Sequence, residues 1–265
     1  MVSFVPDLLA GRSAFIAGGT SGINLAIAQA YAAHGAKVAV LSRKAEKVEA
    51  ATAAIGHGAI GFAADVRDAD AVGAAMKAAA EANGPFDVIV SGAAGNFVAP
   101  AAALSPNGFK TVVDIDLIGT FHVFRAGYDL ARKPGASFIA ISAPQGSAPY
   151  FAQAHVCAAK AGIDMLVKCL AFEWGPEGVR VNSLVPGPID GTEGMAKLAP
   201  NEAMRKIATE ATALRRFGST GDVAMLALYL ASGAASYVTG AIMPADGGQM
   251  LAGNGAFSPA RIFQQ

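Results

Sequence analysis

The sequence predicts a single-domain α/β protein, a doubly wound fold with a parallel sheet of about seven strands. Short apolar runs, typical of buried strands, alternate along the whole chain with segments of helical periodicity. A glycine-rich turn, Gly18 to Ile23, joins the first apolar run to the first helical segment. No linker, repeat or low-complexity tract divides the chain, so residues 1–265 are interpreted as one domain. Because helices join the strands, the sheet should be parallel and covered on both faces.

The elements follow in a regular order. The predicted strands are 14–17, 37–41, 59–63, 86–90, 136–142, 179–185 and 241–243. The predicted helices are 23–31, 45–54, 72–82, 107–131, 152–174 and 220–231. Residues 189–217 form a looser, lid-like insert with one helix near 201–212.

Composition limits the classes of function. Lys+Arg and Asp+Glu both number 20, which gives no indication of a nucleic-acid or membrane-surface partner. Hydrophobic residues make up 53% of the chain and charged residues 15%, which suggests surface buried between subunits of a homo-oligomer. No His/Cys cluster has metal-ligand spacing, so no metal site is expected.

Cellular location is predicted from the cysteines and from the first residues. Cys157 and Cys169 fall in one helical pattern and are interpreted as small core residues of a cytoplasmic protein. The first residues lack the basic lead and long apolar core of a signal peptide, and no apolar run approaches the roughly 18 residues of a spanning helix.

The glycine turn is typical of a phosphate site. A strand that turns through Gly18, Gly19 and Gly22 into a helix points backbone N–H groups and the positive end of the helix at one place. The spacing Gly18-x-x-x-Gly22-x-Asn24 differs from the Gly-x-Gly-x-x-Gly of long-chain dinucleotide enzymes, and a purely structural turn is the alternative. A dinucleotide in a Rossmann-type fold binds beyond the carboxyl ends of the strands.

Two further strand ends bear on the cofactor. The second strand end carries no Asp or Glu for a ribose hydroxyl, whereas Arg43 there fits a 2′-phosphate; the alternative is a solvated arginine. Asp65, after the third strand, could accept a hydrogen bond from an adenine amino group or could be a helix N-cap.

Several motifs in order resemble the short-chain dehydrogenase/reductase family over about residues 8–250. They are the glycine turn, Asp65-Val66, Ala93-Ala94-Gly95, Lys160, Val181-Asn182-Ser183, Pro186-Gly187 and Asp246-Gly247-Gly248. Within the family, the stretches 93–97, 109–116, 173–176 and 186–194 resemble peroxisomal-type 2,4-dienoyl-CoA reductases.

The resemblance implies NADP(H) as cofactor, an acyl-CoA-type substrate and a homotetramer paired through the two long helices. The cofactor would lie on Gly18, Thr20, Ser21, Gly22, Ile23, Ser42, Arg43, Asp65, Val66, Ala93, Ala94, Lys160, Pro186, Gly187 and Ile189. The substrate would lie on Asn96, Phe97 and Tyr150.

The chain departs from the family's usual Asn, Ser, Tyr and Lys. Val156 stands at the Tyr position, Ala143 at the Ser position and Asp116 at the Asn position, while Lys160 is retained. In the cofactor region, Asn24 replaces the third glycine of the turn, and Ser91-Gly92 replaces the usual Asn at the end of the fourth strand.

The missing Tyr changes the expected chemistry. Reduction of an isolated ketone makes a strongly basic alkoxide that needs a proton as it forms. Hydride addition to a conjugated dienoyl thioester makes a far less basic extended enolate, which needs hydrogen-bond donors or positive charge and is protonated later. Lys160, Asp116 and a water can do this without Tyr, so Asp116 and Lys160 are the predicted catalytic residues.

Other interpretations remain open. Lys160 and Asp116 could be surface residues of their helices, and His155 could be a structural or interface histidine. Met195, Leu198 and Met204 suit a mobile lid, an apolar wall for an acyl chain, or plain packing. The protein could instead reduce a ketone or another activated alkene with NADP(H), with His155 or Tyr150 replacing the Tyr, or could bind the cofactor without turnover.

Overall fold

Seven parallel strands form one sheet at the centre of the chain. The computed structural model describes residues 4–251, and its strand order is β3-β2-β1-β4-β5-β6-β7. The strands are β1 Ser13–Ala17, β2 Lys37–Ser42, β3 Ile60–Ala63, β4 Val88–Ser91, β5 Ser137–Ile141, β6 Arg180–Pro186 and β7 Ile242–Ala245. Every paired neighbour runs parallel, which confirms the predicted fold class.

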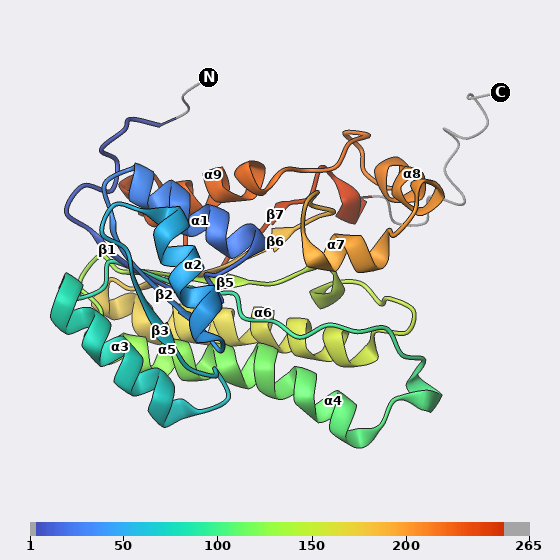
Figure 1. Cartoon of the computed structure of the whole chain (residues 1–265), viewed down its shortest axis with the longest axis horizontal. Helices are drawn as coiled ribbons and strands as arrows, with labels where there is room; N and C mark the ends of the chain where they lie inside the picture. Colours follow the sequence, from blue (N-terminus) through green and yellow to red (C-terminus); the bar gives the residue numbers. More distant parts are fainter. Residues whose placement is uncertain (1–3, 252–265) are drawn as a thin grey trace.

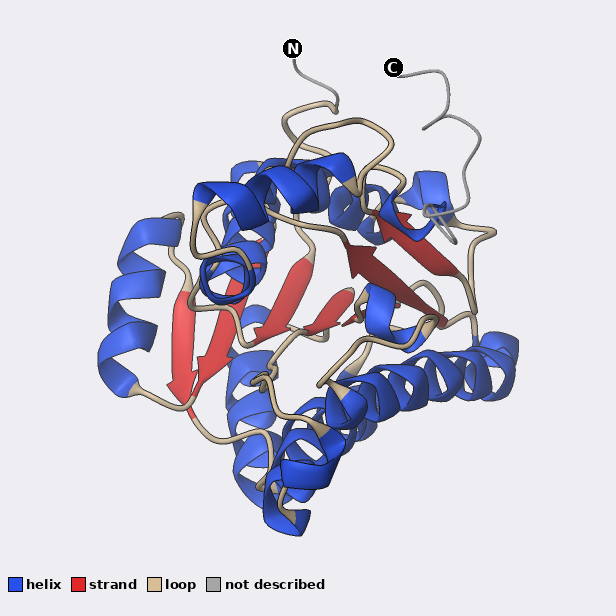
Figure 2. Cartoon of the chain, turned by 90° about the vertical axis from the view of Figure 1, so that its right-hand side faces the viewer, coloured by secondary structure: helices blue, strands red, loops and turns tan. Residues whose placement is uncertain are grey.

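Helices cover both faces of this sheet (Figures 1 and 2). The helices are α1 Gly22–Ala33, α2 Ala45–Ile55, α3 Ala69–Asn83, α4 Pro106–Val113, α5 Gly119–Leu130, α6 Ala154–Trp174, α7 Glu193–Leu198, α8 Glu202–Glu210 and α9 Thr220–Ala231. The core on one face contains residues of α1, α2 and α9, and the core on the other contains residues of α3, α5 and α6. No helix in the described part of the chain is both long and apolar enough to span a membrane.

The inner strands of the sheet bury both of their faces. In β1, Ile16 packs into the core beneath α1 and α9, whereas its neighbour Phe15 packs into the core beneath α3, α5 and α6. Successive side chains of a strand point to opposite faces, so a doubly covered strand is apolar throughout. This is why the strands were recognisable as continuous apolar runs. The strand order reverses between β1 and β4, where such a fold opens its ligand crevice.

Three sequence expectations need correction. The helix predicted over 107–131 is interrupted by a π-helical turn, Asp114–Ile118, between α4 and α5. The insert holds a second short helix, α7, which its composition did not reveal. Cys169 is exposed rather than a core residue, and Cys157 is only partly buried; both are free thiols.

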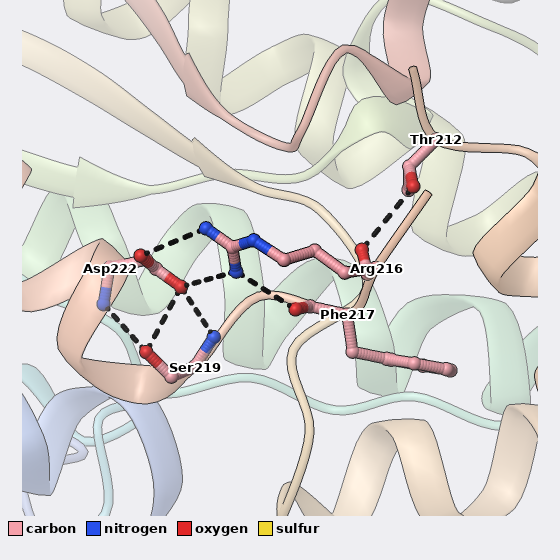
Figure 3. A network of polar contacts seen from close by, with 5 residues as sticks. All are labelled: Thr212, Arg216, Phe217, Ser219 and Asp222. Carbon is pink, nitrogen blue, oxygen red and sulfur yellow. Dashed lines mark hydrogen bonds and ion pairs between the residues drawn. The ribbon is translucent and has the colours of Figure 1, made fainter. Parts of the chain in front are cut away.

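The insert is fastened to the body at its base. Ile189 pairs with Gly218 as an isolated parallel bridge, which brings the two ends of the insert together. The Arg216 guanidinium donates to both carboxylate oxygens of Asp222, at 3.0 and 3.4 Å. Asp222 also closes the capping box of α9 with Ser219, so one network joins the end of the insert to this helix (Figure 3). The insert is therefore anchored where it leaves β6 and where it joins α9.

Candidate active site

The glycine turn brings two stretches of backbone into contact. Gly18 has φ +79°, and a Cβ on it would stand 2.7 Å from the Ala93 nitrogen. Gly22 also has a positive φ, +53°. Ser21 occupies the N-cap of α1 but makes no side-chain capping bond, so the first N–H groups of α1 remain available to an anion. A bare backbone beside an uncapped helix start fits the diphosphate of a dinucleotide.

The adenosine end would lie beyond β2 and β3. Arg43 is exposed at the end of β2, and no ion pair or hydrogen bond to its guanidinium is found within residues 4–251. Asp65 is held by Arg67, whose Nε and Nη2 donate to the two carboxylate oxygens at 3.0 and 2.7 Å. These hydrogen bonds lower the pKa of the Asp65 carboxyl, which stays an acceptor. The N-cap of α3 is Asp68, so the N-cap interpretation of Asp65 is wrong.

The loop after β6 lies between the segment that follows β7 and the glycine turn. Pro186 is the last residue of β6, and a Cβ on Gly187 would meet the Asp246 backbone at 2.5 Å. The Ile189 side chain is buried in the core, so only its backbone is available to a ligand. Thr192, which was not among the predicted cofactor residues, lies over the glycine turn: its Cγ2 is 3.7 Å from the position of a Cβ on Gly22. The sequence could not predict this contact, because 170 residues separate Thr192 from Gly22.

The other predicted cofactor residues lie near the carboxyl ends of the strands. Thr20 and Ile23 in the glycine turn and Ser42 at the end of β2 are partly buried, and Ala93 and Ala94 follow β4. The Val66 side chain is buried against α5 in the core, so only its backbone is available to a ligand.

Lys160 and Asp116 form a buried ion pair. Their Nζ and Oδ2 atoms lie 3.2 Å apart, and their side chains are 7% and 1% exposed. Lys160 Nζ also donates to the Ile141 carbonyl at 3.0 Å, and Asp116 Oδ1 accepts from the Gly95 N–H at 2.6 Å. The surface interpretation of the two residues is therefore wrong. Their side chains contact each other directly, with no water between them.

The surroundings of this pair are apolar where the family has its Tyr. Val156 is buried and packs in a small cluster with Val112 and Ala159. Asp116 lies in the π-helical turn, and its own carbonyl accepts from the Thr120 hydroxyl at 2.6 Å. The Ser91 hydroxyl donates to Thr120 in turn, at 3.0 Å. The hydroxyl chain fixes the backbone that carries the carboxylate.

Two of the predicted substrate residues, Asn96 and Phe97, contact the segment 153–155. Asn96 Oδ1 accepts from Gln153 Nε2 at 3.0 Å, and Gln145 Nε2 donates to Gln153 Oε1 at 3.0 Å. The sequence did not identify Gln145 and Gln153 as site residues, because glutamines at loop positions are common.

The two predicted aromatic substrate residues, Phe97 and Tyr150, have different surroundings. Phe97 is partly exposed, with its ring 4.4 Å from that of His155. His155 is fully covered by its own chain, which excludes the interface interpretation. Tyr150 lies ahead of α6 rather than within it, and burial raises the pKa of its hydroxyl.

Buried polar atoms without protein partners concentrate near the segments that follow β4 and β5. Seven such side-chain atoms occur in the described part of the chain, and five of them belong to Asn24, Asp116, Ser142 and His155. Asp116 Oδ2 counts among them because its approach to Lys160 lacks the alignment of a hydrogen bond. Unpaired buried polar groups are costly in a native protein, so their grouping indicates a place for ligand or ordered water. No cluster of His, Cys, Asp or Glu able to hold a metal ion occurs within residues 4–251.

A parallel sheet whose first strand turns through glycines into a helix is the arrangement of dinucleotide-binding folds. The sequence model of a family described as enoyl-(acyl carrier protein) reductase matches residues 17–250. The chain therefore belongs to the short-chain dehydrogenase/reductase family, as its motifs indicated.

Individual relatives agree with this assignment. The chain is 44% identical over 253 residues to a peroxisomal 2,4-dienoyl-CoA reductase of Pongo abelii, covering 94% of this chain and 87% of the relative. A protein of the same name from Arabidopsis thaliana is 41% identical over 261 residues, with the same shares covered. A crystal structure of a dehydrogenase/reductase from Sinorhizobium meliloti superposes with a TM-score of 0.86 at 31% identity, covering 92% of this chain and 97% of that one.

The contact between Gly18 and Ala93 gives a first prediction. Gly18→Ala should weaken dinucleotide binding at least about tenfold, because the added Cβ must push the turn away from the backbone that borders the crevice. Fluorescence titration with NADPH measures the dissociation constant. Gly58→Ala is the matched control: Gly58 has a similar φ of +72°, but a Cβ there would meet nothing within 4 Å. Equal, small effects of both substitutions would contradict the prediction.

Proposed function

We propose that this protein reduces 2,4-dienoyl-CoA thioesters with NADPH, in the breakdown of unsaturated fatty acids. The observation that carries the proposal is the buried Asp116–Lys160 pair beside a valine at the position of the usual acid. Two similar proteins bear the name of this reductase. The bound cofactor would supply hydride to the far end of the conjugated system.

Lys160 would act as the positive charge of the site. An ammonium group has three hydrogens, and here one is donated to Ile141 while a second faces Asp116. The third is available to a cofactor ribose hydroxyl or to a water that contacts the enolate oxygen. A fixed cation in a partly dry crevice stabilises a developing oxyanion without reorganisation. Lys160 would thereby both bind the cofactor and stabilise the enolate.

Asp116 would control the proton. Its Oδ1 is occupied by the Gly95 N–H, whereas Oδ2 faces Lys160 and has no aligned donor. A water between Oδ2 and the substrate could give a proton to carbon after hydride addition. The Asp116 carboxyl, protonated for this step, would return a proton to the water and then regain its own from solvent. This role accounts for a carboxylate where most of the family has an amide. The amide could orient a water but could not exchange a proton with it.

The acyl thioester would lie against Phe97 and Asn96, with Tyr150 at the rim and the insert as its cover. Phe97 is a partly exposed aromatic face on a rigid support, because His155 packs behind it. Asn96 is fixed by Gln153. We also propose that residues 189–217 cover the bound substrate, since Thr192 already reaches the glycine turn from the start of this insert.

Ketone reduction with Tyr150 or His155 as the acid is the weaker alternative. Burial raises the pKa of Tyr150, which makes its hydroxyl a poorer proton donor, and no Lys or Arg contact of that hydroxyl is found within residues 4–251. His155 is fully buried behind Phe97.

An NADPH-consumption assay tests the function. A dienoyl-CoA should be turned over at least about a hundredfold faster than any simple ketone, the usual worth of a positioned general acid that this site lacks. Product analysis of the enoyl-CoA completes the test. Fast reduction of a plain ketone that Tyr150→Phe or His155→Ala abolishes would favour the alternative, and cofactor binding without turnover would identify a binding protein.

A second test concerns the choice between NADPH and NADH. If Arg43 binds the 2′-phosphate, NADPH should bind roughly ten- to hundredfold more tightly than NADH, because a charge-assisted hydrogen bond contributes about 1.5–3 kcal/mol. Arg43→Ala should remove most of this difference and leave NADH binding intact. Lys37→Ala, at the opposite, amino-terminal end of β2, is the control and should change neither affinity. Equal affinities in the unmutated protein would refute the role of Arg43.

A third test separates the two roles of the ion pair. Lys160→Ala should cut turnover strongly and weaken NADPH binding, whereas Asp116→Ala should cut turnover with little change in NADPH affinity. If Asp116 carries the proton, Asp116→Asn should be nearly as inactive as Asp116→Ala; if it only orients water, Asn should retain much of the activity. We expect the first result. Full dienoyl-CoA turnover in Asp116→Ala would refute both roles.

We further propose a homo-oligomer, a tetramer by resemblance, that pairs through the long helices. Met165, Cys169 and Phe172 are exposed at helical spacing along one side of α6, and Phe121 is exposed on α5. Such an apolar stripe is typical of an interface, and sedimentation of the purified protein would measure the assembly. The cytoplasmic location stays a prediction.

A further inference from the structure

The side chain of Asn24 joins the two sides of the crevice floor. Asn24 is buried in the first turn of α1, and its Nδ2 donates to the Gly92 carbonyl at 2.8 Å. Gly92 is the first residue after β4 and leads directly into Ala93 and Ala94. Its N–H already donates to the Ala17 carbonyl at 3.0 Å. The end of β4 is therefore fastened to β1 by its N–H and to α1 by its carbonyl.

Residues 24 and 92 fit each other tightly. A Cβ on Gly92 would stand 2.3 Å from Asn24 Oδ1 and 2.4 Å from Nδ2. The carboxamide thus fills the space that any side chain at position 92 would take. Gly92 needs no unusual backbone angle, since its φ lies outside the positive region. The Asn24 amide is therefore the reason why position 92 requires glycine.

Only one end of this amide is used by the protein. Asn24 Oδ1 is buried and has no hydrogen-bond partner among the described residues. A purely structural amide is expected to have both ends paired, because an unpaired buried acceptor costs about 1–3 kcal/mol. The unpaired end lies in the crevice region, between the glycine turn and the segment that follows β4.

We propose that Asn24 is a cofactor-positioning residue that sets the distance between the glycine turn and Ala93-Ala94. The inference rests on the dinucleotide part of the proposed function and on no particular substrate. With the amide in place, both sides of the crevice are fixed before the cofactor arrives. Without it, part of the binding energy must order them, which weakens binding with no loss of a direct contact.

The test is a double-mutant cycle on direct binding. Asn24→Ala should raise the dissociation constant for NADPH about three- to tenfold, the usual worth of one hydrogen bond. Gly92→Ala should do the same, because its Cβ displaces the Asn24 amide. The double variant should be no worse than either single one. Residues that act through one contact are non-additive in this way.

Controls distinguish positioning from folding. Gln29→Ala removes another amide-to-carbonyl bond of α1, from Gln29 Nε2 to the Ala54 carbonyl, away from the crevice and should leave the dissociation constant unchanged. Titrations contain NADPH or NADH and no substrate, and melting temperatures are recorded for all variants. In steady state, the KM for NADPH should rise while kcat at saturating NADPH stays within about twofold.

Two results would overturn the inference. One is a lowered melting temperature in Asn24→Ala with an unchanged dissociation constant, which would make the residue structural only. The other is additive losses in the double variant. Binding of dinucleotide without dienoyl-CoA turnover would refute the proposed substrate and leave this test intact, whereas no binding of either dinucleotide would refute both.

Discussion

The buried pair of Lys160 and Asp116 is the interaction on which the site depends, because it joins four elements. Asp116 belongs to the π-helical turn and accepts from Gly95 after β4, while Lys160 belongs to α6 and donates at the end of β5. Burial of two charges is favourable only with good geometry and further hydrogen bonds. Each partner has such a bond, so the chain can keep a cation in a nearly dry place.

The π-helical turn shows how the carboxylate is brought to this place. A turn of this kind widens a helix by one residue and frees backbone groups, and it is frequent at functional sites. Here the Thr120 hydroxyl donates a hydrogen bond to the Asp116 carbonyl. The Ser91 hydroxyl, at the end of β4, donates to Thr120. Val156 then fills the space toward α4 with apolar contacts. The position at which the family pattern has its Tyr is thus used for packing, and the proposed chemistry would fall to the charged pair.

Periodicity and motif order predicted most of the fold and the register of the site. Continuous apolar runs identified the strands because both faces of the sheet are covered, and the helical register placed Lys160 and Asp116 toward one crevice. The misses have physical reasons. A π-helical turn leaves the apolar pattern of a helix almost unchanged, and contacts such as Thr192 with Gly22 depend on how a loop folds back. Cys169 looked like a core residue because a stripe on an outer face has the same period as a buried one.

At the carboxyl ends of the strands, some backbone carbonyls need hydrogen-bond donors from side chains. Where strand order reverses, neighbouring connections leave toward opposite faces, and carbonyls at the strand ends lose the partners that a continuing strand would provide. Two carbonyls at the carboxyl edge of the sheet are satisfied by side-chain nitrogens. Asn24 donates to the Gly92 carbonyl, next to the break in strand order, and Lys160 donates to the Ile141 carbonyl at the end of β5, one strand further on. The hydrogen bond at the end of β5 therefore also fixes the ammonium group beside Asp116.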